Sequence, residues 1–244
     1  MTQTQWKRAF GLGVAGGFSV AMAAALVMFW PAQRQNPWEL EIREFELADQ
    51  TNAPPKNGIL FVGSSTVRLW HTLQQDFPGY RIVKRGFGGS QIEDVMTFLD
   101  RIVLPYEPRM ILLYAGDNDL AAGKTPEEVV KDFEEFVAEI HKELPKTRIG
   151  FISVKPSLAR WHLLKKVRKT NRLIQELTQK DPLVTYIDVF TPMLDEKGRL
   201  KTIYLADDGL HLSPKGYALW TAIIRTNLPP KLPGVSTAQR PPLK

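Results

Sequence analysis

The chain has 244 residues, of which 43% are hydrophobic and 24% are charged, and it contains no cysteine. This composition is close to a globular average, which excludes collagen-like, coiled-coil and wholly disordered chains. The absence of cysteine excludes a disulfide scaffold, a thiolate zinc site and a cysteine nucleophile, while the net charge of +6 at first allows nucleic acid or anionic lipid as a partner.

The first predicted element is a membrane-spanning segment at residues 9–30, which contain no charged residue. A helix of this length extends roughly 33 Å and matches a hydrocarbon core of about 30 Å. Lys7 and Arg8 precede it, so we expect an uncleaved signal anchor with the body of the chain extracytoplasmic, in the periplasm if the source is Gram-negative. A cleavable signal peptide is the alternative, because small residues at 23–25 form a cleavage site, but a cut there would leave an apolar terminus. Residues 1–35 are therefore interpreted as anchor and linker.

Residues 36–228 are predicted to form one domain. An amphipathic helix over Trp38–Phe45 comes first, and apolar runs of strand length then alternate with helical patterns. The runs are continuously apolar, which indicates a parallel sheet covered on both faces. We therefore predict an α/β fold, a three-layer α/β/α sandwich with a five-stranded parallel sheet. The predicted strands are 59–62, 81–83, 110–114, 149–154 and 184–188, and helical periodicity runs through 67–77, 129–144, 163–177 and 217–228.

Two glycine-containing segments follow the first two predicted strands, at the edge of the sheet where such folds place their sites. The first is Gly63–Thr66, in which a serine stands at a strand-to-helix turn near the N–H groups of the new helix. An ordinary turn with a helix cap is the plainer interpretation of this segment alone. The second is Gly86–Ser90, whose glycines let the backbone approach a ligand. It is not a dinucleotide-binding motif, because Gln91 stands where a third glycine is required.

Two polar segments complete the predicted site. Gly116–Asp119 follows the third strand, and the amide of Asn118 can donate to a developing oxyanion, although Asx-rich turns are also common helix caps. In the last segment, Asp208 stands three residues before His211, so its carboxylate can accept from Nδ1 and leave Nε2 free as a base. Ser213 and Pro214 look like the cap and first residue of the final helix. No second histidine lies at ligand spacing, so we expect no metal.

In this order the four segments resemble the SGNH (GDSL-type) hydrolase family, whose four sequence blocks supply a serine, a glycine, an asparagine and a histidine. The resemblance runs from Gly63 to His211. It implies a flavodoxin-like sandwich and a serine hydrolase that needs no cofactor. It implies that Ser65 is the nucleophile, His211 the base and Asp208 the acid that orients the base. The oxyanion-hole donors that it implies are Ser65, Gly89 and Asn118.

The first block departs from the family pattern. It usually reads Gly-Asp-Ser-Leu, whereas here it reads Gly-Ser-Ser-Thr, so Ser64 replaces the aspartate and becomes a rival nucleophile. The expected function is hydrolysis of carboxylic esters, esterase- or lipase-like, through an acyl-enzyme at Ser65. One alternative is acyl transfer to, or deacetylation of, a cell-envelope glycan. An alternative of another class is a non-catalytic binding module, which the change at Ser64 would favour.

Local charge separates the domain from the chain ends. Lys155–Arg172 contains seven basic residues and no acidic one; we favour a solvated helix face, with Arg160 and Trp161 on the rim of a pocket as the alternative. Residues 229–244 contain five prolines and no aromatic residue, and they are predicted to be a disordered tail. Residues 1–35 and 229–244 each hold three basic residues and no acidic one, so the domain has no net charge. We therefore expect an ester substrate and a membrane as partners, and no nucleic acid.

Overall fold

The structure, a computed structural model, describes residues 36–232. The chain divides into two units, residues 1–37 and 38–244, and the fold described below belongs to the second unit. The predicted membrane segment 9–30 and residues 233–244 of the predicted tail lie outside the described residues. Within residues 36–232, every helix is too short or too polar to cross a membrane.

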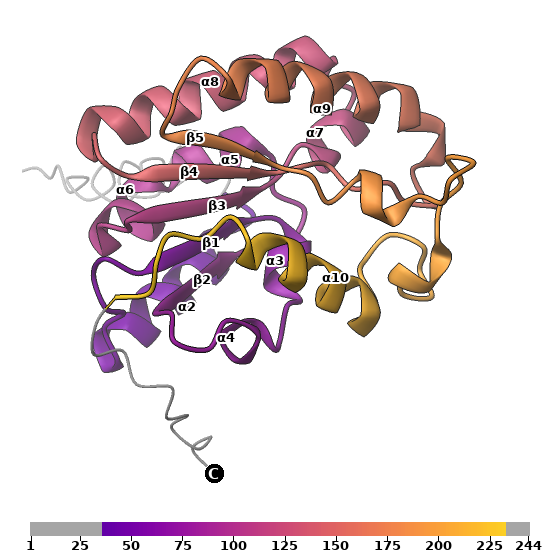
Figure 1. Ribbon diagram of the computed structural model, residues 1–244. Coiled ribbons are helices and arrows are strands. Elements are labelled where there is room, and N and C mark those ends of the chain that lie inside the picture. The colour runs from indigo at the N-terminus through magenta and orange to yellow at the C-terminus, as the bar shows by residue number, and fades with distance from the viewer. Residues whose placement is uncertain (1–35, 233–244) are drawn as a thin grey trace, which may run out of the picture. The chain divides into compact units, whose positions relative to one another are not determined.

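Five parallel strands form a single sheet in the order β2-β1-β3-β4-β5, which confirms the predicted fold class (Figure 1). In the central register, Gly63 lies opposite both Gly86 and Tyr114, so the carboxyl ends of the first three strands are level. The order reverses at β1, which places a topological switch point between β1 and β3. The strands are β1 (Ile59–Gly63), β2 (Ile82–Gly86), β3 (Met110–Tyr114), β4 (Arg148–Ile152) and β5 (Val184–Ile187).

Helices cover both faces of the sheet, as Figure 1 shows. One face is covered by α2 (Glu39–Thr51), α5 (Ile92–Thr97), α6 (Leu99–Ile102), α8 (Pro126–Glu143) and α9 (Leu164–Thr178). The other is covered by α3 (Ser65–Arg68), α4 (Leu73–Asp76) and α10 (Pro214–Arg225). The connections also contain α7 (Asp117–Ala121) and the 3₁₀ turns η1 (Leu104–Tyr106), η2 (Trp161–Leu163), η3 (Thr191–Met193) and η4 (Thr202–Tyr204).

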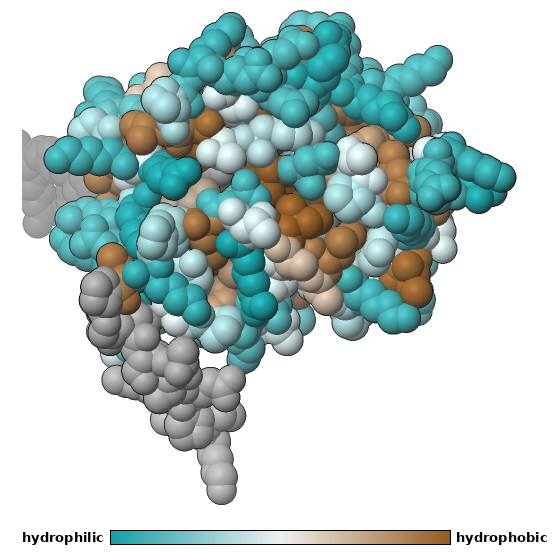
Figure 2. Space-filling model, viewed as in Figure 1, coloured by the Kyte–Doolittle hydropathy of each residue, from teal (hydrophilic) through white to brown (hydrophobic). Residues whose placement is uncertain are grey.

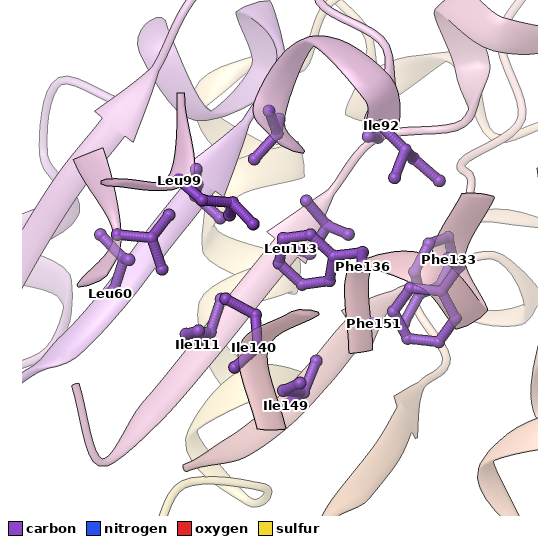
Figure 3. Close-up of a cluster of buried hydrophobic side chains, with 14 of the residues drawn as sticks. Leu60, Ile92, Leu99, Ile111, Leu113, Phe133, Phe136, Ile140, Ile149 and Phe151 are labelled. Atoms are coloured by element: carbon purple, nitrogen blue, oxygen red, sulfur yellow. The ribbon is translucent and has the colours of Figure 1, made fainter. Parts of the chain in front are cut away.

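The core has two parts because alternate strand residues point to opposite faces. Figure 3 shows the first part, where Leu113 and Ile149 of the sheet lie against Phe136 and Ile140 of α8. On the other face, Phe61 meets the Trp70 ring at 5.7 Å between centroids. Both sets of side chains are buried, which explains why the strands read as continuously apolar in the sequence.

Three strands have bounds that differ from the sequence prediction. The strand predicted at 81–83 runs on to Gly86 and includes Arg85, whose side chain is buried. Arg85 can be buried in the strand because its Nε donates to the Tyr106 hydroxyl at 2.7 Å and its guanidinium pairs with Asp49. A buried charged residue breaks the hydrophobic pattern without breaking the strand. The strands predicted at 149–154 and 184–188 end earlier, at 152 and 187.

The continuous helix predicted at 67–77 is instead two short helices, α3 and α4, with a turn between them. The carbonyls of Arg68 and Trp70 at this break accept from Nζ of Lys84, at 3.2 and 3.4 Å. Trp70 turns into the core, and its Nε1 donates to Asp76 Oδ2 at 2.6 Å. These hydrogen bonds to Lys84 and Asp76 replace some of the intrahelical bonds that a continuous helix would make.

Gly63 ends β1 at a point where no other residue fits. Its φ is +132°, and a Cβ at this position would lie 2.0 Å from the carbonyl oxygen of Tyr114. The next residue, Ser64, donates its N–H to that same oxygen at 3.0 Å. The close approach lets the chain turn out of the sheet at once, and the residue after Ser64 therefore begins α3 at the edge of the sheet.

Candidate active site

Ser65 lies at the first position of α3, at the carboxyl end of β1, and its side chain is partly exposed. Its Oγ lies 2.9 Å from Nε2 of His211. The rival serine, Ser64, is fully buried, and its Oγ has no hydrogen-bond partner among the described residues. Of these two serines, Ser65 is therefore the one whose hydroxyl is open to a ligand.

His211 is held by a short loop that ends at α10. An antiparallel bridge between Leu205 and Leu212 closes this loop, and the N–H of Ala206 donates to the carbonyl of His211 at 2.9 Å. Ser213 then caps α10 by accepting from the N–H of Gly216 at 3.2 Å, as the sequence predicts. The backbone is therefore held both before and after His211, and the imidazole points at Ser65.

Asp208 uses both carboxylate oxygens within the same loop. Its Oδ1 accepts from the N–H groups of Leu210 and His211, each at 2.9 Å, and its Oδ2 lies 2.5 Å from Nδ1 of His211. The contact with His211 is the main cause that lowers the pKa of Asp208 to about 2, and the two backbone bonds lower it further. A carboxylate on Nδ1 fixes the tautomer in which Nε2 has no proton and can accept one from Ser65.

The predicted oxyanion-hole residues lie on two neighbouring loops. Gly89 has φ +79°, and open space surrounds the position of a Cβ there. No hydrogen bond between described residues uses the N–H of Gly89 or of Ser65. The amide of Asn118 donates from Nδ2 to the carbonyl of Ser90 at 3.0 Å and so ties the two loops together. One hydrogen on Nδ2 is left for another acceptor.

Asp119 is a residue whose contribution the sequence analysis missed. It is fully buried, its Oδ1 accepts from the N–H of Ile92 at 3.1 Å, and its Oδ2 accepts from the N–H of Gly116 at 2.9 Å. Burial raises its pKa to about 6. These bonds join the start of α5 to the start of α7, and they hold the Gly89 and Asn118 loops at a fixed spacing. Its place one residue after Asn118, at the third position of a helix, was the available signal.

The basic segment divides into two parts. On α9, the cations Lys165, Arg168, Lys169 and Arg172 are exposed, as expected for a solvated face. Lys155 is instead buried, and its Nζ donates to the Tyr114 hydroxyl at 3.2 Å. Burial is the main cause that lowers the pKa of Lys155.

Arg160 lies beside the predicted oxyanion hole, and Trp161 lines a small pocket together with Arg160 and Asp117. Nη2 of Arg160 donates to Asn118 Oδ1 at 2.8 Å, and Nη1 lies 3.1 Å from Oδ2 of Asp117. The side chain of Trp161 follows directly in the chain and is 39% exposed. The sequence had favoured a solvated helix face for this whole segment; Arg160 is instead a direct neighbour of Asn118.

A groove of 570 Å³ opens beside His211, between the turn after α3 and the start of α10. Figure 2 shows hydrophobic surface gathered around α10, whereas the surface over α8 and α9 is largely hydrophilic. His211 and Asp208 form one polar wall of the groove, and most of the other lining residues are apolar: Leu69, Ala206, Leu212, Pro214, Tyr217 and Ala218. Among residues 36–232, no group of three or more His, Asp or Glu side chains is arranged to hold a metal ion.

Comparison with known proteins gives one family. Residues 56–219 match the GDSL-like lipase/acylhydrolase family, whereas a search of curated proteins gave no match. One solved structure is that of a protein from Streptococcus pneumonia described as a platelet activating factor. The chain is 26% identical to it, with a TM-score of 0.68, over 86% of this chain and 99% of that one. It is 20% identical, with a TM-score of 0.66, to a GDSL-like lipase from Bacteroides thetaiotaomicron, over 76% and 96%.

A more distant structure is an acetyl-xylooligosaccharide esterase from Geobacillus. Its identity to this chain is 14% and its TM-score 0.58, over 71% of this chain and 94% of that chain. At this identity the likeness shows a shared fold.

The pKa of Asp208 provides a direct test of the contact with His211. Because the folded state lowers this pKa, the contribution of Asp208 to stability is present above about pH 4 and is lost as the pH falls toward 2. We expect a ¹³C NMR titration of the carboxyl to give a midpoint near 2. The variant His211→Ala should raise the midpoint toward the ordinary value, because the largest cause of the shift is then absent.

The matched control is His71→Ala, since His71 lines the same groove, whereas the hydrogen bonds of Asp208 within residues 36–232 go to Leu210 and His211. This variant should leave the midpoint of Asp208 unchanged. An ordinary midpoint in the unaltered protein, or the same low midpoint in His211→Ala, would contradict the geometry.

Proposed function

The chain belongs to the GDSL-like lipase/acylhydrolase family, and we propose that it hydrolyses carboxylic esters through an acyl-enzyme at Ser65. The observation that carries the proposal is the unbroken series of contacts from Ser65 Oγ to His211 Nε2 at 2.9 Å and from His211 Nδ1 to Asp208 Oδ2 at 2.5 Å. Nucleophile, base and orienting acid are thus in order and within hydrogen-bond reach of each other.

In the first half of the reaction, Ser65 Oγ attacks the ester carbonyl carbon while its proton passes to Nε2 of His211. Asp208 stabilises the imidazolium that results. When the tetrahedral intermediate collapses, the bond to the alcohol oxygen breaks and His211 gives its proton to that leaving group. In the second half, His211 takes a proton from water while the water oxygen attacks the acyl carbon. The bond from that carbon to Ser65 Oγ then breaks, His211 returns the proton to Oγ, and the carboxylic acid is released.

Three donors support the negative charge that develops on the carbonyl oxygen. They are the N–H groups of Ser65 and Gly89 and the remaining hydrogen on Nδ2 of Asn118. Each donor of this kind typically contributes about 10²–10³ in turnover. All three come from loops at the carboxyl ends of β1, β2 and β3, which the register of the sheet holds level.

The replacement of the family aspartate by Ser64 is compatible with this function. Ser64 is buried below the turn, and the contacts of Ser65 with His211 do not pass through its side chain. An inert binding module would have no need of an intact Ser65–His211–Asp208 series, so the hydrolase is the better supported of the two functions.

The groove beside His211 supports esters with an apolar substituent. Its apolar wall is formed largely by residues of α10 and by Leu69, one turn after Ser65 in the chain. A substituent bound there displaces water from the apolar side chains, which contributes about 0.8 kcal/mol for each buried methylene. A substrate class of this kind is distinct from acetylated sugars, which present polar hydroxyl groups to the site.

Paired serine variants test the proposed nucleophile. In the full-length protein, we expect Ser65→Ala to lower the hydrolysis of p-nitrophenyl acetate by about 10⁴–10⁶, because no nucleophile is left in reach of His211. Ser64→Ala is the matched control: it removes a buried hydroxyl that has no partner, and the rate should change by less than about threefold. Activity that survives Ser65→Ala would contradict the proposal, and activity lost only in Ser64→Ala would assign the nucleophile to that residue.

An ester series tests the groove. With p-nitrophenyl esters from acetate to octanoate, we expect kcat/KM to rise by up to about fourfold per methylene. Ala218→Phe should remove the rise while retaining activity on acetate, because the ring fills the exposed groove wall. Lys215→Phe adds the same ring to α10 outside the groove and should leave the rise intact. A fall in kcat/KM with chain length would count against the apolar groove and favour acetyl groups, as on a glycan.

A further inference from the structure

The amide of Asn118 is held at both of its polar atoms. Its Oδ1 accepts from Nη2 of Arg160 at 2.8 Å, and its Nδ2 donates to the carbonyl of Ser90 at 3.0 Å. Rotating the amide by half a turn would place its NH₂ group against the guanidinium and its oxygen against the carbonyl of Ser90. Both new contacts would pair like with like, so the two partners together permit one orientation of the amide.

Arg160 is itself fixed by a cluster of charged groups. Its Nη1 lies 3.1 Å from Asp117 Oδ2, and the same oxygen lies 3.5 Å from Nζ of the buried Lys155. The side chain of Arg160 is 22% exposed. A guanidinium already held by an ion pair with Asp117 loses little further freedom when it also donates to Asn118.

The loop that carries Arg160 also contacts the loop of His211. The N–H groups of Leu158 and Ala159 both donate to the carbonyl of Gly209, at 2.8 and 3.1 Å. Gly209 stands between Asp208 and His211, and its own φ is +64°. One short segment of chain therefore joins the Asp208–His211 turn to the amide of Asn118.

The charge of Arg160 acts in the same direction as its geometry. A cation on Oδ1 draws electron density away from the Nδ2 group and strengthens that group as a donor. The hydrogen bond from Nδ2 to the oxyanion is then stronger than the same bond from an amide whose oxygen faces water.

We infer that Arg160 is a positioning residue for this reaction: it fixes and polarises the amide of Asn118, so that Nδ2 donates to the oxyanion of the tetrahedral intermediate. The inference rests on the proposed ester hydrolysis and adds to it a residue that does not touch the substrate.

A double-mutant cycle in the full-length protein tests it, with kcat and KM measured on p-nitrophenyl acetate. Asn118→Ala should lower kcat by about 10²–10³. Arg160→Met should lower kcat by about tenfold with little change in KM, and the double variant should match Asn118→Ala alone. Arg160→Lys, which keeps a cation near Asp117 but not the planar fork, should lie between Arg160→Met and the unaltered protein.

The matched control is Arg172→Met, since Arg172 is an exposed arginine of the same basic segment whose partner is Glu176. It should leave kcat and KM unchanged. An unchanged kcat in Arg160→Met, or a double variant whose loss is the product of the two single losses, would overturn the inference. If Arg160→Met does not fold, as a thermal unfolding curve would show, Arg160→Lys with and without Asn118→Ala gives the same comparison.

The failure of the proposed function is separate from the failure of this inference. Activity retained by Ser65→Ala would remove the proposed function. If Ser65→Ala is inactive but the loss of kcat in the double variant is the product of the losses in Arg160→Met and Asn118→Ala, the proposed hydrolase stands. Only the positioning role of Arg160 is then removed.

Discussion

The site depends on the close approach of two backbones at the end of β1. A Cβ on Gly63 would lie 2.0 Å from the carbonyl oxygen of Tyr114, and the N–H of Ser64 donates to that oxygen at 3.0 Å. This contact fixes the end of β1 against the end of β3, so Ser65, the first residue of α3, and Asn118, the second residue of α7, follow adjacent strand ends. The glycine is required twice, for the positive φ and for the space. The register of the sheet therefore sets the positions of Ser65 and Asn118.

The two halves of the site meet through a segment that contributes no reacting group. The His211 turn comes from the end of the chain and the Asn118 loop from its middle, and the contacts from 158 and 159 to Gly209 and from Arg160 to Asn118 join them. A group that supplies base and a group that supplies an oxyanion donor must keep their spacing within a fraction of an ångström to act together. The start of this segment is held in place because Lys155 is buried and contacts Asp117.

Much of this arrangement could be predicted from the sequence, because parallel strands bring their carboxyl ends to one edge. The continuous apolar runs predict the sheet, and the position of each polar segment directly after a run predicts which residues gather. The contact of Arg160 with Asn118 could not be predicted, since it joins residues far apart in the chain through the path of an irregular loop. The burial of Lys155 and Arg85 could not be predicted either, because a charged residue is buried only where the fold supplies a specific partner, here Asp117 and Asp49.

The proposed function depends above all on the role of Ser65 as a nucleophile activated by His211. Its most direct measurement is labelling of the full-length protein with a fluorophosphonate, followed by mass-spectrometric mapping of the modified peptide. We expect a single adduct on Ser65 that forms far more slowly in His211→Ala, because Oγ then keeps its proton. An adduct on Ser64, an adduct at Ser65 that forms equally fast without His211, or no adduct at all would contradict it.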